Sequence, residues 1–217
     1  PPIMVVKPMP GPSIAISATF TADAVEQTLA FWMRELAFDY QIRMAPYNQV
    51  FQLLLDPNSV LAANRGGVNI LLVRFEDWAR VEEGAAPDLA RLESDVSQFV
   101  KSLRDAAQSS SSPFLVCICP ASPAFESNPA AAELQHRMEA VVVSGLDGLA
   151  TVYLVHTGEI QDWYPVAQIH DPLSDKLGHI PYTPQYFAAL GTALARKIHA
   201  LRTTPYKVVA LDCDDTL

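Results

Sequence analysis

The sequence has few charged residues, few cysteines and no long apolar run, and each shortage excludes a class of protein. Only 18% of its 217 residues are charged, whereas 50% are hydrophobic. This composition allows a sizeable buried core and is unlike that of a disordered chain. No apolar run reaches the roughly 20 residues of a membrane-spanning helix, and the proline-broken start lacks the apolar segment of a signal peptide.

Basic residues are also in the minority, because the formal net charge is −9 and the isoelectric point is about 4.9. An acidic surface repels nucleic-acid phosphates and anionic lipid headgroups. We therefore expect neither nucleic acid nor a membrane surface as a partner, although a basic protein surface stays possible.

The three cysteines are Cys117, Cys119 and Cys213. The first two lie two positions apart in an apolar, strand-like run, so they share a face and sit too close for an easy disulfide within one strand. We expect all three to be reduced, small and buried, and the compartment to be the cytoplasm.

Apolar runs alternate with segments of helical periodicity along the chain. Strands are expected at 14–18, 38–44, 68–75, 114–119, 150–156 and 207–211. Helices are expected at 21–36, 50–55, 87–107, 128–143 and 184–201, with a long irregular connection at 158–183. This alternation predicts βαβ units in an α/β fold with a mostly parallel sheet between helical layers.

The chain divides into three parts by composition. Residues 1–13 hold five prolines and one glycine and are predicted to be a linker. Residues 14–205 form the α/β domain, and 206–217 the start of another domain. Because the chain begins with proline and stops inside a motif, we expect it to be a segment of a longer polypeptide.

The chain ends in the apolar run 207–211 followed by Asp212-Cys213-Asp214-Asp215-Thr216. A carboxylate at the end of a strand can attack phosphorus, and a second one two residues later can exchange a proton. An ordinary acidic turn is the alternative. The pattern resembles motif I of the haloacid dehalogenase (HAD) superfamily, which implies Asp212 as nucleophile, Asp214 as acid/base and Mg²⁺ held by both. The rest of such a domain is absent, so these 217 residues are not expected to transfer phosphoryl groups.

With that motif in place, most of the chain resembles the N-terminal domain of FkbH-like proteins. The resemblance rests on four further stretches: 16–21, 45–49, 56–59 and 71–78. FkbH-like proteins join an SGNH-hydrolase-like domain to a HAD domain of subfamily IIIC. The resemblance implies a three-layer αβα, flavodoxin-like fold. It also implies a role in loading a glyceryl unit from 1,3-bisphosphoglycerate onto the phosphopantetheine arm of an acyl carrier protein, in polyketide or nonribosomal peptide assembly.

An SGNH hydrolase needs a serine after its first strand, oxyanion donors and a late Asp-x-x-His. Ser17, Asn48, Asp175 and His179 are the candidates, as nucleophile, oxyanion donor, orienter and base. The chain departs from the pattern, because Ser17 is not in Gly-Asp-Ser, Gly-x-Asn-Asp is missing after the third strand, and Asp175 lies four residues before His179. The alternatives are a strand-end serine, an Asx-turn asparagine and a loop histidine.

These observations leave three hypotheses. The first is an accessory domain that presents a substrate on a carrier protein to an adjacent HAD domain. The second is an active SGNH-type acyl hydrolase or acyltransferase that uses Ser17. The third is a docking domain of a megasynthase with no catalytic role. The departures from the SGNH pattern favour the first.

Overall fold

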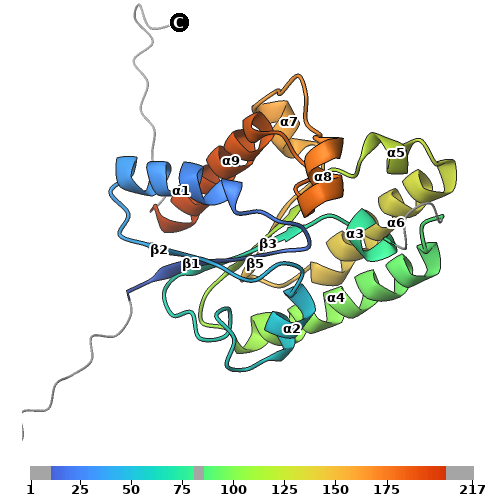
Figure 1. Cartoon of the computed structure of the whole chain (residues 1–217). Helices are drawn as coiled ribbons and strands as arrows, with labels where there is room; N and C mark the ends of the chain where they lie inside the picture. Colours follow the sequence, from blue (N-terminus) through green and yellow to red (C-terminus); the bar gives the residue numbers. More distant parts are fainter. Residues whose placement is uncertain (1–10, 81–85, 204–217) are drawn as a thin grey trace, which may run out of the picture.

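A computed structural model describes residues 11–80 and 86–203 and contains a five-stranded, all-parallel sheet (Figure 1). Its strands are β1 (Ser13–Ala18), β2 (Gln41–Met44), β3 (Val68–Val73), β4 (Phe114–Ile118) and β5 (Val152–Val155), in the order β2-β1-β3-β4-β5. This is the flavodoxin-like order. The predicted strand at 207–211 and most of the predicted linker lie outside the described residues.

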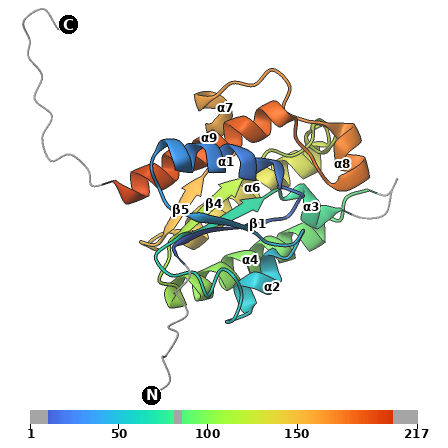
Figure 2. The same ribbon diagram turned by 60° about the vertical axis from the view of Figure 1, so that its left-hand side comes forward.

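Helices cover both faces of the sheet (Figure 2), which confirms the three-layer αβα prediction. One face carries α1 (Ala24–Glu35), α7 (Glu159–Trp163), α8 (Pro172–Gly178) and α9 (Pro184–Arg202). The other carries α2 (Val50–Leu55), α3 (Glu76–Ala79), α4 (Leu89–Ser109), α5 (Pro123–Glu126) and α6 (Pro129–Leu146). Side chains alternate between the layers, so Ile14 and Ile16 pack toward α1 and α9 whereas Ala15 packs toward α2 and α4.

The central strands are mostly apolar because both of their faces are covered. All six residues of β3 and all five of β4 are buried, as expected for a parallel sheet between two helical layers. Cys117 and Cys119 are buried in and after β4 without a disulfide, and their sulfur atoms lie 3.9 Å apart. None of the helices in the described ranges is both long and apolar enough to cross a membrane.

Several helices begin with a proline that follows a polar cap. Pro129, Pro172 and Pro184 stand in the first turns of α6, α8 and α9, and the preceding Asn128, Asp171 and Thr183 each accept a hydrogen bond from a backbone N–H of the first turn. Proline is pre-organised for this position and its missing N–H costs nothing there. The predicted start of α9 at Pro184 is confirmed.

The predicted irregular connection at 158–183 is wrong, because it contains α7 and α8. Helix α7 has five residues, and α8 has seven with none of them buried. Neither helix therefore produces an apolar periodicity, which is the signal from which helices are predicted. The second strand is also shorter than predicted and begins at Gln41.

Helix α9 runs from the carboxyl-terminal edge of the sheet to its amino-terminal edge. Just before α9, the Tyr182 hydroxyl donates to the Pro120 carbonyl, which follows β4, at 2.7 Å. At the other end, the Arg202 guanidinium donates to the carbonyls of Gly66 and Gly67, which precede β3. The two ends of α9 thus mark opposite ends of the domain.

Candidate functional site

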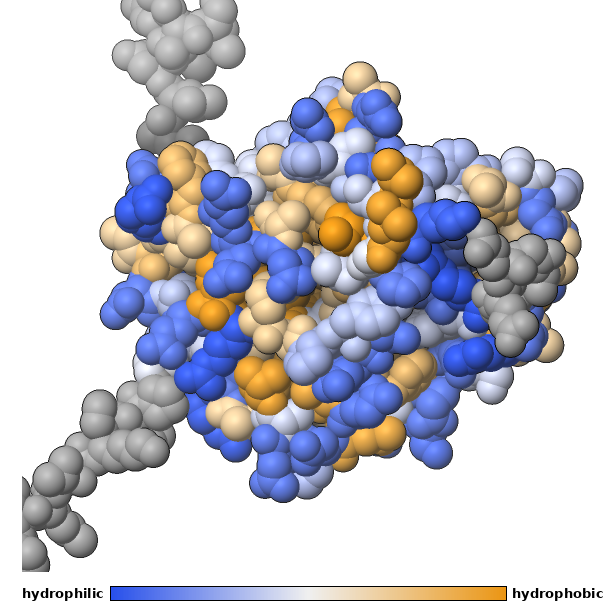
Figure 3. All heavy atoms as spheres, viewed as in Figure 1, coloured by the Kyte–Doolittle hydropathy of each residue, from blue (hydrophilic) through white to orange (hydrophobic). Residues whose placement is uncertain are grey.

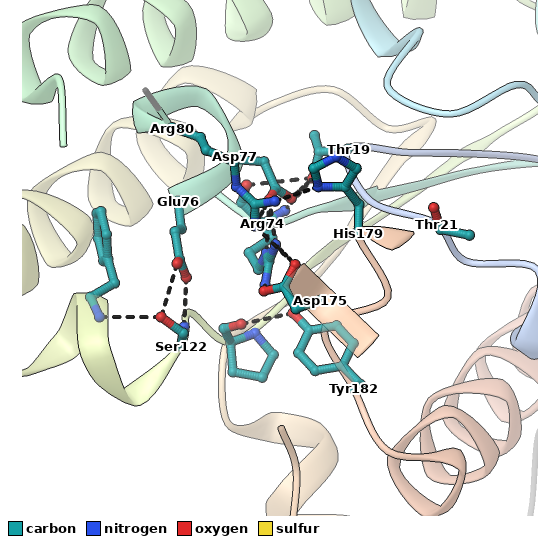
Figure 4. A network of polar contacts seen from close by, with 12 residues as sticks. Thr19, Thr21, Arg74, Glu76, Asp77, Arg80, Ser122, Asp175, His179 and Tyr182 are labelled. Atoms are coloured by element: carbon teal, nitrogen blue, oxygen red, sulfur yellow. Dashed lines mark hydrogen bonds and ion pairs between the residues drawn. The ribbon is translucent and has the colours of Figure 1, made fainter. Parts of the chain in front are cut away.

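Six polar residues meet at the carboxyl-terminal edge of the sheet, where ligands bind in open α/β sheets (Figure 4). We call this group the polar cluster; it consists of Thr19, Arg74, Asp77, Arg80, Asp175 and His179. The residues come from the segments after β1 and β3 and from α8, which places them over neighbouring strands.

Arg74 lies at the centre of the polar cluster, with its side chain 0% exposed. Its guanidinium donates to Asp77 from Nε (3.0 Å) and Nη2 (2.5 Å) and to Asp175 from Nη1 (2.8 Å) and Nη2 (3.1 Å). Burial alone would lower the pKa of Arg74, but the two carboxylates raise it overall, so the guanidinium stays charged. A buried charge needs such pairing because removing it from water is costly.

The two carboxylates of the polar cluster have different environments. Burial raises the pKa of Asp77, and the charges of Arg74 and Arg80 offset this only in part. Burial also acts to raise the pKa of Asp175, but hydrogen bonds and charges from Arg74 and Arg80 outweigh it and lower the pKa. Asp175 is therefore held as a carboxylate that bridges α8 to the segment after β3.

Thr19 fixes the polar cluster to the sheet. Its hydroxyl donates to Asp77 Oδ2 at 2.8 Å and accepts from the backbone N–H of Arg74 at 3.0 Å. Its own N–H bonds the carbonyl of Leu72 in β3 at 3.1 Å. With 0% exposure, Thr19 holds the two segments together and does not face a ligand.

His179 caps the carboxyl end of α8 in a left-handed conformation, with φ 53°. Its ring stacks on Tyr47, with centroids 5.0 Å apart and planes 11° apart, and its Nδ1 contacts Arg80 Nη1. Its carbonyl accepts from Thr21 N at 2.8 Å, and Thr21 Oγ1 donates to Gly178 O at 2.8 Å. The strained backbone is thus secured from two sides.

The hydrogen-bonded Ser17–His179–Asp175 chain that the second hypothesis requires is not assembled. Ser17 Oγ is buried without a hydrogen-bond partner in the described part of the chain. Strand alternation turns Ser17, like Ala15, toward the α2–α4 layer. Both oxygens of Asp175 contact guanidinium groups, and only its backbone carbonyl bonds His179, at 3.0 Å.

Asn48 lies close to this edge, in the turn that follows β2. Its backbone N–H donates to Ala18 O at 3.2 Å and its φ is 54°, a left-handed conformation that asparagine tolerates well. It turns the chain after β2 and thereby brings Tyr47 against His179. Its role as an oxyanion donor stays a prediction.

The predicted phosphotransfer and Mg²⁺ residues, Asp212 and Asp214, lie outside the described residues. Within 11–80 and 86–203, no group of three or more His, Cys, Asp or Glu side chains is arranged to hold a metal ion.

A cavity of about 450 Å³ opens beside the polar cluster. Proline and alanine form much of its wall, and its polar lining consists of Arg80, Ser122, His170, Asp175 and Lys176. Burial and the charge of Arg74 lower the pKa of His170, which keeps its imidazole neutral near pH 7. The cavity has the size and mixed lining of small-molecule sites.

Sequence reasoning missed Thr19, Arg74, Asp77 and Arg80. Arg74 pairs with a carboxylate 101 positions away, and such a pairing leaves no periodic signal. One signal was present, because an arginine at the carboxyl end of the apolar run 68–73, with an aspartate three residues later, is unusual next to a buried strand.

The comparisons with known proteins show the fold. No protein-family model and no curated protein matches the sequence. The chain is similar to the N-terminal part of the protein BF1531 from Bacteroides fragilis, a structure containing a phosphatase domain complexed with Mg. The TM-score is 0.69 at 10% identity, over 88% of this chain and 52% of that chain, so this chain spans about half of that structure.

A second similar structure is a carbohydrate esterase family 2 enzyme plus carbohydrate-binding domain from Corynascus thermopiles (Myceliophthora fergusii). The TM-score is 0.51 at 16% identity, over 89% of this chain and 67% of that chain. Identities this low carry information about fold and none about activity. The chain has an SGNH-like α/β fold, as the sequence predicted.

Proposed function

We propose that this chain is the SGNH-like companion domain of a HAD-type phosphotransferase of the FkbH-like kind. In this role it presents a glyceryl or related acyl group, carried on the phosphopantetheine arm of an acyl carrier protein, to the adjacent phosphotransferase domain. The Asp212-x-Asp214 motif supports this proposal, as does the similarity to about half of a structure that contains a phosphatase domain.

One observation carries the choice of a binding role over a hydrolytic one. Asp175 would orient His179 in a hydrolase, but both of its carboxylate oxygens accept hydrogen bonds from Arg74 and Arg80 instead. A base without its orienting carboxylate, and a serine without a hydrogen bond to that base, lack the geometry of a nucleophilic dyad. The polar cluster therefore acts as a rigid support for the cavity beside it.

The cavity is suited to the polar groups of a carrier-protein arm. Arg80 lines it with a side chain that is 30% exposed, while Asp77 and Asp175 hold the guanidinium in place. A fixed guanidinium can donate to a carbonyl or phosphate oxygen with little loss of side-chain freedom. The lining of the cavity includes apolar surface from Pro123, Pro172 and Pro181.

Calorimetric titration with apo and holo carrier protein tests the proposal. We expect saturable binding of the holo form, and weaker binding to Arg80→Gln. The matched control is Arg91→Gln on α4, an exposed arginine that pairs with Asp95 and does not line the cavity. No binding at high micromolar concentration, or equal weakening by both variants, would contradict the proposal.

The alternative of an acyl hydrolase is favoured by the likeness to an esterase fold and by the presence of Ser17 and His179. It requires Ser17 to become accessible and Asp175 to leave its guanidinium partners. The third hypothesis is a docking domain without a ligand site. It predicts that apo and holo carrier protein bind equally well and that Arg80→Gln does not change the binding.

A further inference from the structure

A groove of about 210 Å³ lies on the α1–α9 face, away from the polar cluster. We call it the aromatic groove; it is lined by Trp32, Leu36, Tyr164, Thr192, Ala195, Arg196 and His199. The Trp32 indole N–H donates to Thr192 Oγ1 at 3.0 Å, so the polar atom of this ring is satisfied within the domain and its apolar surface faces the groove. Phe31, next to it on α1, is 45% exposed.

Cations pack over the aromatic rings of this face. Arg196 and Lys197 lie over the ring of Trp163, at 5.3 and 4.7 Å from its centroid. Arg34 lies over Phe31 at 5.7 Å, and near the end of α9 Arg202 lies over Tyr40 at 5.6 Å. Helix α9 contains no acidic residue. Trp, Tyr and Arg are the residues that dominate binding energy at protein interfaces.

The position of the aromatic groove determines what can reach it. Ala195, Arg196 and His199 belong to the last turns of α9, which ends at Arg202. Only four positions separate Thr203 from Lys207, the first residue of the strand predicted at 207–211 in the next domain, and four extended residues span at most about 14 Å.

We propose that the aromatic groove is the docking surface for the domain that continues the chain after α9. The proposal rests on the proposed function only for the identity of that domain as a phosphotransferase. Exposed aromatic rings with cations over them lie at the end of α9, where the chain leads on to the next domain.

This placement has a consequence for substrate transfer. The cavity lies at the carboxyl-terminal edge of the sheet, whereas α9 ends at the amino-terminal edge. Helix α9 spans about 28 Å for its 19 residues. A phosphotransferase docked on the aromatic groove leaves the cavity open to a carrier protein, and the acyl arm has to move along the length of α9 between the two sites.

The test uses the polypeptide extended through its next domain, with a specific protease site inserted at 204–206. After cleavage of the folded chain, we expect the two halves to remain associated. The double variant Phe31→Ser, Arg196→Glu is expected to weaken the association at least about tenfold, as loss of interface anchors does. The matched control is Leu177→Ser on α8, a residue that is 77% accessible. Figure 3 shows exposed apolar atoms at the place that α8 occupies in Figure 1.

Separation of the unmodified halves would overturn the proposal, and so would equal association of the groove variant and the Leu177→Ser control. Circular dichroism of each variant confirms that the domain is folded. Phosphate-ester hydrolysis by the second half, measured with Mg²⁺, tests the proposed function separately. A second half that docks on the groove but has no phosphatase activity would contradict the proposed function and support the docking surface.

Discussion

The polar cluster and the aromatic groove lie at opposite ends of the domain, and they differ in how their cationic side chains are buried and paired. In the polar cluster, the side chain of Arg74 is withdrawn from water and is matched by Asp77 and Asp175. Around the aromatic groove, Arg34 and Arg196 are exposed and lie over aromatic rings. Charges satisfied inside the fold stabilise it and position its segments, whereas exposed cations on aromatic rings keep binding capacity for a partner. Arg74 therefore has a structural role, whereas Arg34 and Arg196 are suited to contact a partner.

The largest expected effect on stability comes from replacing Arg74, whose guanidinium is buried. Arg74→Met leaves Asp77, 4% exposed, and Asp175 without their main partner, and we expect unfolding free energy to fall by about 3–5 kcal/mol. Urea denaturation measures this. The double variant Arg74→Met, Asp77→Asn should recover part of the loss, because it removes the unpaired buried charge. A loss below about 1 kcal/mol would mean that the polar cluster does not stabilise the fold.

The next effect depends on pH. Asp175→Asn should lower stability at neutral pH by about 1.5–3 kcal/mol, as loss of hydrogen bonds to charged groups does. Because the folded-state pKa of Asp175 is below that of an unfolded aspartate, about 3.9, its stabilisation is complete above that pH and is lost as pH falls through the lower folded-state value. Denaturation curves of the two proteins should therefore converge in acid, and a constant difference would contradict this assignment.

A smaller effect is expected at the cap of α8. His179→Ala and His179→Gly both remove the stack on Tyr47 and the contact with Arg80. Only glycine relieves the left-handed backbone at φ 53°, so the glycine variant should be the more stable of the two by about 1 kcal/mol. Thermal denaturation of the pair measures this, and equal stability would show that the backbone there carries no strain.

The smallest effect on stability belongs to the aromatic groove. Arg196→Glu changes an exposed residue and should alter unfolding free energy by no more than about 0.5 kcal/mol, in contrast to Arg74→Met. A large loss in urea denaturation would make Arg196 a structural residue and would remove the distinction between the two ends.

Much of the fold could be predicted from the sequence because it depends on local apolar patterns. The runs at 68–75 and 114–119 became β3 and β4, and the short helix at 50–55 is confirmed as α2. Helix α8 escaped prediction because it buries no side chain. It is held by Asp175 and by hydrogen bonds from Thr21, and these contacts have no periodicity.

The candidate site was harder to predict than the fold. The structure brings Asp175 and His179, two of the predicted site residues, to the edge of the sheet, but their partners are arginines that no local pattern indicated. Ser17 was assigned to the end of β1, yet one step of strand alternation decides which layer its side chain faces. Long-range charge pairing and strand register are properties of the folded chain as a whole.

We propose that the carboxyl-terminal edge binds an acyl group without hydrolysing it. The most direct test is the turnover of an acyl-thioester and of a nitrophenyl ester by the wild-type chain and by Ser17→Ala. We predict no hydrolysis above the uncatalysed rate in either protein. Hydrolysis by the wild type that Ser17→Ala abolishes would contradict the binding role and establish an acyl hydrolase instead.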